Sequence, residues 1–216
     1  MSNSDLSANK AGPALAPPSG WYRWVICGLL FAATGLLYVD RQTIGFLKPT
    51  LSHAYGWDDA DYALIVRAFM FAYAFGFILF GRIIDVLGAK RGYTIAVIIW
   101  TSAHLACAGL GFLPPQFLLI SFIITQAALG LGQGGNFPAA LKAVAEWFPQ
   151  RERAFAIGIF NAGSNMGAII TPLLVPFILV LYGWQWAFVA TGALSIFWLI
   201  FWLPFYAKPA ESKFVG

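Results

Sequence analysis

An acidic and a basic residue, Asp40 and Arg41, stand side by side near the end of the first long apolar run. The residues from 25 to 39 carry no charge, so at about 1.5 Å per residue the pair lies roughly 24 Å along a helix from Trp24. An ionised side chain near the middle of a bilayer about 30 Å thick costs at least about 2.5–3.5 kcal/mol. Both groups are therefore expected to face protein or water, where an arginine can bind a carboxylate through two parallel hydrogen bonds.

Helical rotation separates the two charges. At about 3.6 residues per turn, Arg41 shares a stripe with Tyr38, whereas Asp40 is turned about 120° away from it. We expect Arg41 and Tyr38 to face a cavity and Asp40 to point between helices. A charge pair that snorkels outward to the interface is the alternative.

Three amides in the fourth apolar run, Gln126, Gln133 and Asn136, fall on one helical stripe. Gln126 and Gln133 are about 20° apart and Asn136 is about 60° further round. Amides in a dry bundle need partners. Two interpretations stay open: they join helices through hydrogen bonds, or they line a wet cavity.

The fifth apolar run has two different faces. Asn161, Ser164 and Asn165 share one side within about 100°, and Gly163 and Gly167 lie toward the opposite side. Glycines four residues apart favour close packing with another helix. For the polar side, the favoured interpretation is that its side chains line a cavity rather than join helices.

Single polar side chains interrupt two other runs. Tyr73 offers a cavity hydroxyl, although an aromatic residue in a helix more often packs. His104 could relay protons, but a neutral, hydrogen-bonded core histidine is the favoured interpretation.

The composition indicates the elements that must position these residues. Of the 216 residues, 60% are hydrophobic and 10% are charged, whereas soluble domains carry roughly 25% charged residues. This is therefore an all-α membrane protein, with a bundle at residues 24–206 between an N-terminal tail (1–23) and the start of a loop (207–216). Six runs are long enough to span: about 24–48, 62–87, 93–112, 116–141, 154–181 and 185–206.

The positive charges gather on one side of these runs. The basic residues on that side are Lys10, Arg23, Arg82, Lys90, Arg91, Arg151, Arg153, Lys208 and Lys213. The positive-inside bias predicts that both termini are cytoplasmic. Because this placement accounts for the net charge of +4, a nucleic-acid partner is not expected.

The connection between the second and third runs contains a spaced motif. Its residues are Gly81, Asp85, Gly88, Lys90 and Arg91. This pattern resembles the signature loop of the major facilitator superfamily, apart from Val86, where a cation is usual. The resemblance implies that Asp85 and the cations near Arg91 hold the cytoplasmic helix ends together in an outward-open state.

Longer segments resemble the anion:cation symporters of that superfamily, and most of all its hexuronate and other sugar-acid transporters. They are Tyr38-Val39-Asp40-Arg41, Gly134-Gly135-Asn136-Phe137-Pro138, Ala145-Glu146-Trp147-Phe148-Pro149 and Gly158-Ile159-Phe160-Asn161. The resemblance implies proton-coupled uptake of a small organic anion across a bacterial-type inner membrane. It also implies that the chain is the N-terminal half of the fold, six helices in two inverted three-helix repeats, which works with a C-terminal half absent from this sequence.

The same resemblance implies residue roles. Arg41 would meet the substrate carboxylate, Asp40 would couple the proton, and Tyr38 and Tyr73 would line the cavity. Asn161 and Ser164 would add polar contacts, with Gln133 hydrogen-bonding at the site.

One departure from the family pattern concerns the fourth helix, where many relatives carry Arg and Glu seven residues apart. This chain has Gln126 and Gln133 there. Since glutamine does not titrate, Asp40 is expected to carry any proton coupling. Losing both charges together avoids leaving one buried ion unpaired.

Other functions stay open. The alternatives are a carrier of another organic anion, such as a monocarboxylate or an aromatic acid, and a non-transporting six-helix membrane protein if 216 residues is the full length. No pattern indicates an enzyme, a cofactor or a metal site.

Overall fold

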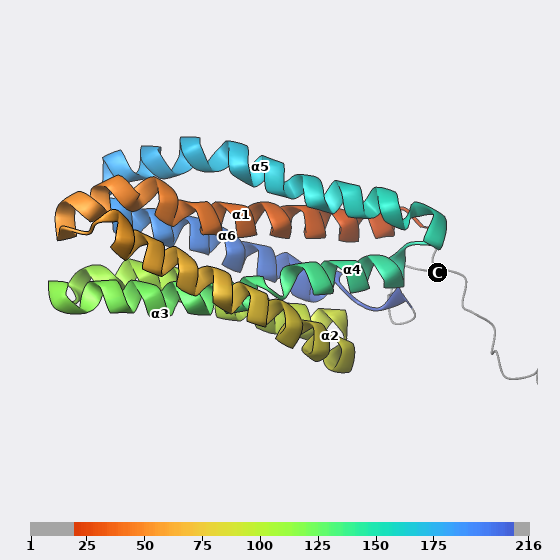
Figure 1. Cartoon of the computed structure of the whole chain (residues 1–216). Helices are drawn as coiled ribbons and strands as arrows, with labels where there is room; N and C mark the ends of the chain where they lie inside the picture. The colour runs from red at the N-terminus through yellow and green to blue at the C-terminus, as the bar shows by residue number, and fades with distance from the viewer. Residues whose placement is uncertain (1–19, 210–216) are drawn as a thin grey trace, which may run out of the picture.

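The computed structural model describes residues 20–209, and every regular element in that part of the chain is helical. Residues 1–19 of the predicted tail and 210–216 of the predicted loop lie outside it. The long helices run side by side in an elongated bundle, and α4 continues the line of α3 (Figure 1). The elements are α1 (Tyr22–Tyr55), α2 (Asp59–Gly109), the short 3-10 turn η1 (Leu110–Phe112), α3 (Pro115–Gln133), α4 (Asn136–Trp147), α5 (Gln150–Tyr182) and α6 (Trp184–Phe205).

The 51-residue α2 is two helices joined by a sharp reversal. A straight helix of this length would extend roughly 76 Å, far beyond a hydrocarbon core about 30 Å thick. The helix breaks at Gly88, whose φ of 83° and ψ of 165° lie outside the helical region, and glycine adopts positive φ without steric cost. A Cβ placed on Gly92 would lie 2.6 Å from Ile84 Cγ1, so the two legs touch directly after the turn. Figure 1 shows the reversal at the right-hand end of α2.

Five helical segments within residues 20–209 are long and apolar enough to cross a membrane. The sequence predicts six. The difference arises at residues 59–112, where one 54-residue segment contains both the second and the third predicted runs.

The fourth predicted run, 116–141, is also interrupted. α3 ends at Gln133 and α4 begins at Asn136, because Gly134 and Gly135 lie between them and favour a break. A Cβ on Gly134 would lie 2.6 Å from the Gly76 carbonyl carbon. The break therefore falls before Pro138, at the place where two helices come into backbone contact.

Helix α5 packs closely on α1 through the two glycines that the sequence singles out. A Cβ on Gly167 would lie 2.8 Å from Tyr38 Cβ, and one on Gly163 would lie 3.1 Å from Gly35 N. The predicted packing pair is confirmed.

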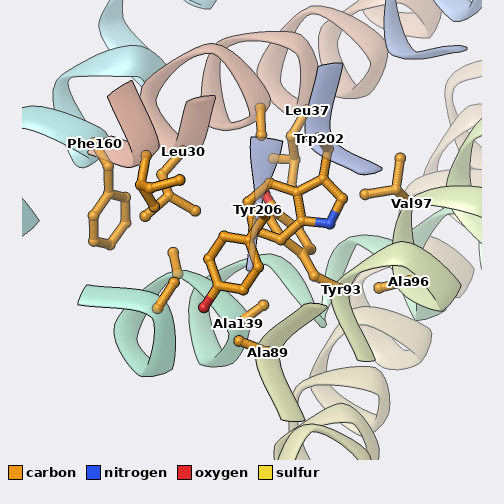
Figure 2. Packing of buried hydrophobic residues seen from close by; sticks show 14 of the residues in the cluster. Leu30, Leu37, Ala89, Tyr93, Ala96, Val97, Ala139, Phe160, Trp202 and Tyr206 are labelled. Atoms are coloured by element: carbon orange, nitrogen blue, oxygen red, sulfur yellow. The ribbon is translucent and has the colours of Figure 1, made fainter. Parts of the chain in front are cut away.

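A large apolar core fixes the other helices around α1. Tyr93 on the second leg of α2 packs edge-on against Trp202 of α6, with ring centroids 5.1 Å apart. Trp202 in turn stacks on Tyr206 at 4.2 Å. Figure 2 shows these rings beside Leu30 and Leu37 of α1 and Ala139 of α4. The core thus holds α1, α2, α4 and α6 together and sets the frame for the polar residues of α1.

Candidate functional site

Arg41 lies in a small cluster formed by three helices. Its Nε donates a hydrogen bond to Gln133 Oε1 of α3 at 3.1 Å. Gln133 is itself fully buried, and its Nε2 donates to the Leu37 carbonyl at 3.1 Å. The amide therefore fixes the guanidinium in position from the α3 side.

Aromatic rings surround the remaining faces of the guanidinium. The Arg41 Cζ atom lies 4.7 Å from the ring centroid of Tyr73, 5.1 Å from that of Phe69 and 5.2 Å from that of Tyr38. Such cation–π contacts contribute about 0.5–2 kcal/mol, most where water is excluded. The rings attract the cation and leave its hydrogen-bond donors free for another group.

One of those donors has no partner. Arg41 Nη2 is buried without a hydrogen bond, and the ion pairs recorded for residues 20–209 do not include Arg41. A buried donor without a partner is costly, and the cost is greater for a charged group. The site is therefore chemically suited to a carboxylate or another small anion.

Asp40 points away from Arg41, as the rotation argument predicts. It is fully buried between α1, α2 and α6. Its Oδ2 accepts a hydrogen bond from Ser195 Oγ at 3.0 Å, and its Oδ1 lies 3.3 Å from His104 Nε2. His104 is also bonded to Thr191 Oγ1 at 2.7 Å, so it is the hydrogen-bonded core histidine that the sequence favours.

The other α3 and α4 amides join helices. Gln126 Nε2 donates to Cys107 Sγ at 3.7 Å, and both residues are buried. Asn136 Nδ2 donates to Thr34 Oγ1 at 3.4 Å and its Oδ1 accepts a bond from the Tyr93 hydroxyl. For Gln126 and Asn136 the helix-joining interpretation therefore holds.

The polar side of α5 is separate from this cluster. Asn161 and Asn165 are exposed, and Ser164 donates to the Asn161 carbonyl at 2.6 Å. No contact with Arg41 is recorded for these three within the described part of the chain. The structure thus brings Tyr38, Arg41, Tyr73 and Gln133 together and leaves Asn161 and Ser164 on an open face.

An apolar cavity of about 310 Å³ lies between α1, α5 and α6. Its walls include Gly35, Val39, Met166 and Phe197, and it contains none of the predicted site residues. Without a polar or charged group it cannot neutralise an anion. The cavity expected beside Arg41 is therefore not this one, and the candidate site is the Arg41 cluster.

The signature loop forms a tight turn with an unexpected partner. Lys142 Nζ of α4 lies 3.4 Å from Asp85 Oδ1 and donates to the Ile84 carbonyl at 3.0 Å. A cation at the end of a helix satisfies its last carbonyls and its dipole. The cation beside Asp85 is thus Lys142, whereas the resemblance points to Lys90 and Arg91, which have no recorded ion pair within residues 20–209.

Sequence reasoning missed several members of these clusters. Phe69, Ser195 and Thr191 look like ordinary members of apolar helices, and only tertiary packing sets them against Arg41 or Asp40. Lys142 carried a weak signal, because it is the only cation of the amphipathic segment α4.

The fold and the site together define an all-helical membrane protein with a cation held in its interior. A family model described as the Major Facilitator Superfamily matches residues 30–215. The chain belongs to the major facilitator superfamily.

Several curated relatives are named as sugar-acid transporters. The chain is 37% identical to a galacturonate transporter of Dickeya chrysanthemi, over 88% of this chain and 54% of the relative. It is 36% identical to a hexuronate transporter of Escherichia coli strain K12, over 88% of this chain and 43% of the relative. The predicted similarity to hexuronate and sugar-acid carriers is confirmed. The chain spans about half the length of these relatives.

Solved structures share the fold. A bacterial homologue of the human lysosomal transporter Spinster, in an inward-facing and unoccupied conformation, matches with a TM-score of 0.77 at 21% identity, over 88% of this chain and 44% of that one. A proton:xylose symporter matches with a TM-score of 0.74 at 16% identity, over 87% and 46%. The matched family and the curated relatives are transporters rather than enzymes, as the sequence predicts.

Proposed function

We propose that this chain is one half of a proton-coupled symporter for hexuronate-like sugar acids in a bacterial-type inner membrane. The similarity to galacturonate and hexuronate transporters supports the substrate class. The observation that carries the proposal is the buried, unpaired Nη2 of Arg41.

Arg41 would bind the substrate carboxylate. Its free Nη2 offers two N–H donors, while Nε is held by Gln133. In a site with little water, an arginine with a free donor attracts an anion more strongly than it does at a surface. The rings of Tyr38 and Tyr73 would form the walls of the site, with their hydroxyls available to sugar hydroxyl groups.

The open polar face of α5 would complete the site from the other side. Asn161 is exposed and Ser164 is partly exposed, so both remain available to a ligand or to another part of the protein. We propose that a second six-helix half covers this face and encloses the substrate. This arrangement is consistent with the share of each relative that the chain spans.

In the membrane the two legs of α2 would cross separately, giving six crossings. The reversal at Gly88 supports this topology. Residues 22–112 would then form one inverted three-helix repeat and residues 115–205 the other. Both termini and the Asp85 turn would lie on the cytoplasmic side by the positive-inside bias. Gly81, Asp85, Gly88, Lys90 and Arg91 would act there as a conformational gate.

Asp40 would carry the coupling proton, since Gln126 and Gln133 cannot titrate. When Asp40 is ionised, the two neighbours on α1 carry opposite charges. Protonation would remove the negative charge and leave Arg41 to attract the anion. Deprotonation on the other side of the membrane would weaken binding and release the substrate.

The test is uptake of radiolabelled galacturonate, glucuronate and galactonate by the transporter that contains this chain, reconstituted in liposomes with an imposed proton gradient. We expect uptake that needs the gradient and falls strongly in Arg41→Gln. The matched control is Arg67→Gln, because Arg67 is exposed and its Nε bonds only the Ala63 carbonyl one turn away. Equal uptake by Arg41→Gln and wild type would contradict the proposal.

Another small organic anion is the second candidate. A probable sulfoacetate transporter of Cupriavidus necator is 32% identical over 88% of this chain and 43% of the relative. Competition of labelled galacturonate uptake by sulfoacetate, monocarboxylates and aromatic acids separates the two candidates.

A further inference from the structure

Four side chains from three helices form a fully buried polar cluster behind Arg41. They are Asp40 of α1, His104 on the second leg of α2, and Thr191 and Ser195 of α6. Asp40 and His104 are the two titratable members, and their nearest atoms, Oδ1 and Nε2, lie 3.3 Å apart. No exposed surface is left on either side chain.

The hydrogen bonds fix most of the protons in this cluster. Thr191 Oγ1 donates to the Ala187 carbonyl at 2.9 Å, so its oxygen accepts at 2.7 Å from His104 Nε2. Ser195 Oγ donates to Asp40 Oδ2 at 3.0 Å. The Nε2 proton is thus directed to Thr191, and the histidine is the Nε2–H tautomer.

Two polar atoms in the cluster have no hydrogen-bond partner, Asp40 Oδ1 and His104 Nδ1. A buried carboxylate oxygen without a donor carries a large desolvation cost. One added proton removes that cost. On Oδ1 it makes a neutral acid, and on His104 Nδ1 it makes an imidazolium whose Nε2–H faces the Asp40 Oδ1 atom. The pair then changes from a net charge of −1 to 0, and no bond between heavy atoms is made or broken.

Few other charged groups face this pair. On α2, Cys107 lies one turn after His104 and is close enough to Asp40 to interact with it electrostatically. On α1, Arg41 is directed to Gln133 and α3 instead. From α6 the pair meets the hydroxyls of Thr191 and Ser195, which do not titrate.

We propose that His104 is a second proton-binding residue, which holds the transported proton jointly with Asp40. The two side chains titrate as one unit. This inference rests on the proposed function for its role in transport, but the shared proton is a property of the folded chain and is measurable without a substrate.

The first experiment is nitrogen-15 NMR of the histidines in lipid nanodiscs, using the 216-residue chain purified without a histidine tag. The chain has two histidines, and the exposed His53 is assigned with His53→Gln. We expect the ring-nitrogen signals of His104 to move between about pH 5 and about pH 8 in wild type and to stay fixed in Asp40→Asn. An identical response, or an identical absence of response, in wild type and Asp40→Asn overturns the proposal.

The second experiment is the pH profile of sugar-acid uptake by the transporter that contains this chain. A residue that only fills space would lower uptake equally at every pH. We expect His104→Gln to flatten the ratio of uptake at about pH 6 to that at about pH 8 from several-fold to about one. A reduced uptake with an unchanged ratio overturns the proposed role.

Two controls separate folding and function from the shared proton. If His104→Gln does not fold, Thr191→Val is the second variant, because it removes the hydroxyl that accepts from His104 Nε2. Its readout is the ring-nitrogen signals of His104. These signals must shift relative to wild type if the tautomer assignment holds. If the NMR result holds but sugar acids are not transported, the proposed function fails and the Asp40–His104 pair stands. If the NMR result fails while sugar acids are taken up, the shared proton of Asp40 and His104 is ruled out and the proposed transport function stands.

Discussion

Asp40 and Arg41 are neighbours in the chain, yet their side chains bond to different helices. Asp40 accepts from Ser195 of α6, and Arg41 donates to Gln133 of α3. The backbone of α1 therefore separates a negative site from a positive site. In the proposed mechanism, a change in the charge of one side would reach the other through a single helix, which is a short path for coupling a proton to an anion.

Arg41→Lys should lower substrate affinity although it keeps the charge. Lysine has no Nε–H to donate to Gln133 and no planar face to stack on Tyr73. We expect uptake efficiency, kcat/KM, to fall at least about tenfold, or about 1.4 kcal/mol. Liposome uptake measures it, and Arg67→Lys, at an exposed arginine, should leave the value unchanged.

Gln133→Glu should make anion binding depend on pH. The new carboxylate would lie beside Arg41 Nε, where the amide oxygen is now 3.1 Å away, and would compete with the substrate carboxylate. We expect affinity to fall at least about tenfold near pH 8 and to recover as pH falls, because the protonated acid resembles the amide. Binding titrations at several pH values measure it.

The matched variant for that experiment is Gln126→Glu. Gln126 is equally buried, but its recorded partner is Cys107 Sγ. A carboxylate there has no cation to pair with, so we expect lower thermal stability rather than weaker competition with the substrate. Equal effects of the two variants on affinity would contradict the assignment of the anion site to Arg41.

Gly167→Leu should destabilise the bundle. Even a Cβ at this position would lie 2.8 Å from Tyr38 Cβ, and overpacking of this kind costs about 1–3 kcal/mol. Thermal unfolding in detergent measures the loss as a lower Tm. Gly158→Ala is the control, because a Cβ there meets nothing within 4 Å, and its Tm should stay equal or rise slightly.

Lys142→Gln should have little effect on stability and a larger effect on transport. The Lys142 and Asp85 side chains are 28% and 70% exposed, so their ion pair contributes at most about 1 kcal/mol. If the loop is a gate, uptake falls by more than this energy explains. A double-mutant cycle with Asp85→Asn measures the coupling energy between Lys142 and Asp85. A loss of uptake no larger than the loss of stability, with both expressed as free energies, would argue against a gate.

Much of the fold could be predicted because its signals are local. Charge-free runs indicate helices, Gly88 marks a reversal, and glycines at 163 and 167 mark a packing face. The direction of Asp40 followed from helical rotation alone. The junction between α3 and α4 was not predicted, because the predicted run 116–141 continues across Gly134 and Gly135, which lie between the two helices.

The site could be predicted only in part. Arg41, Tyr38 and Gln133 stand out as polar groups in apolar runs, but their roles at the site were implied by the family resemblance. Phe69 was not predicted, since the sequence does not distinguish the aromatic residue that contacts Arg41 from the many that pack in the core. Ser195 and Lys142 were missed for a similar reason, because their roles depend on which helix lies opposite, and that is set by tertiary packing.

The bond between Ser195 and Asp40 joins residues 155 positions apart, and this separation has a consequence for biosynthesis. At about 5–20 residues per second, a ribosome takes roughly 8–30 s to make the intervening chain. Throughout that interval the Asp40 carboxylate cannot accept its hydrogen bond from Ser195, because α6 has not yet been made. The hydrogen bond that holds the α1 carboxylate therefore forms only after α6 has been made.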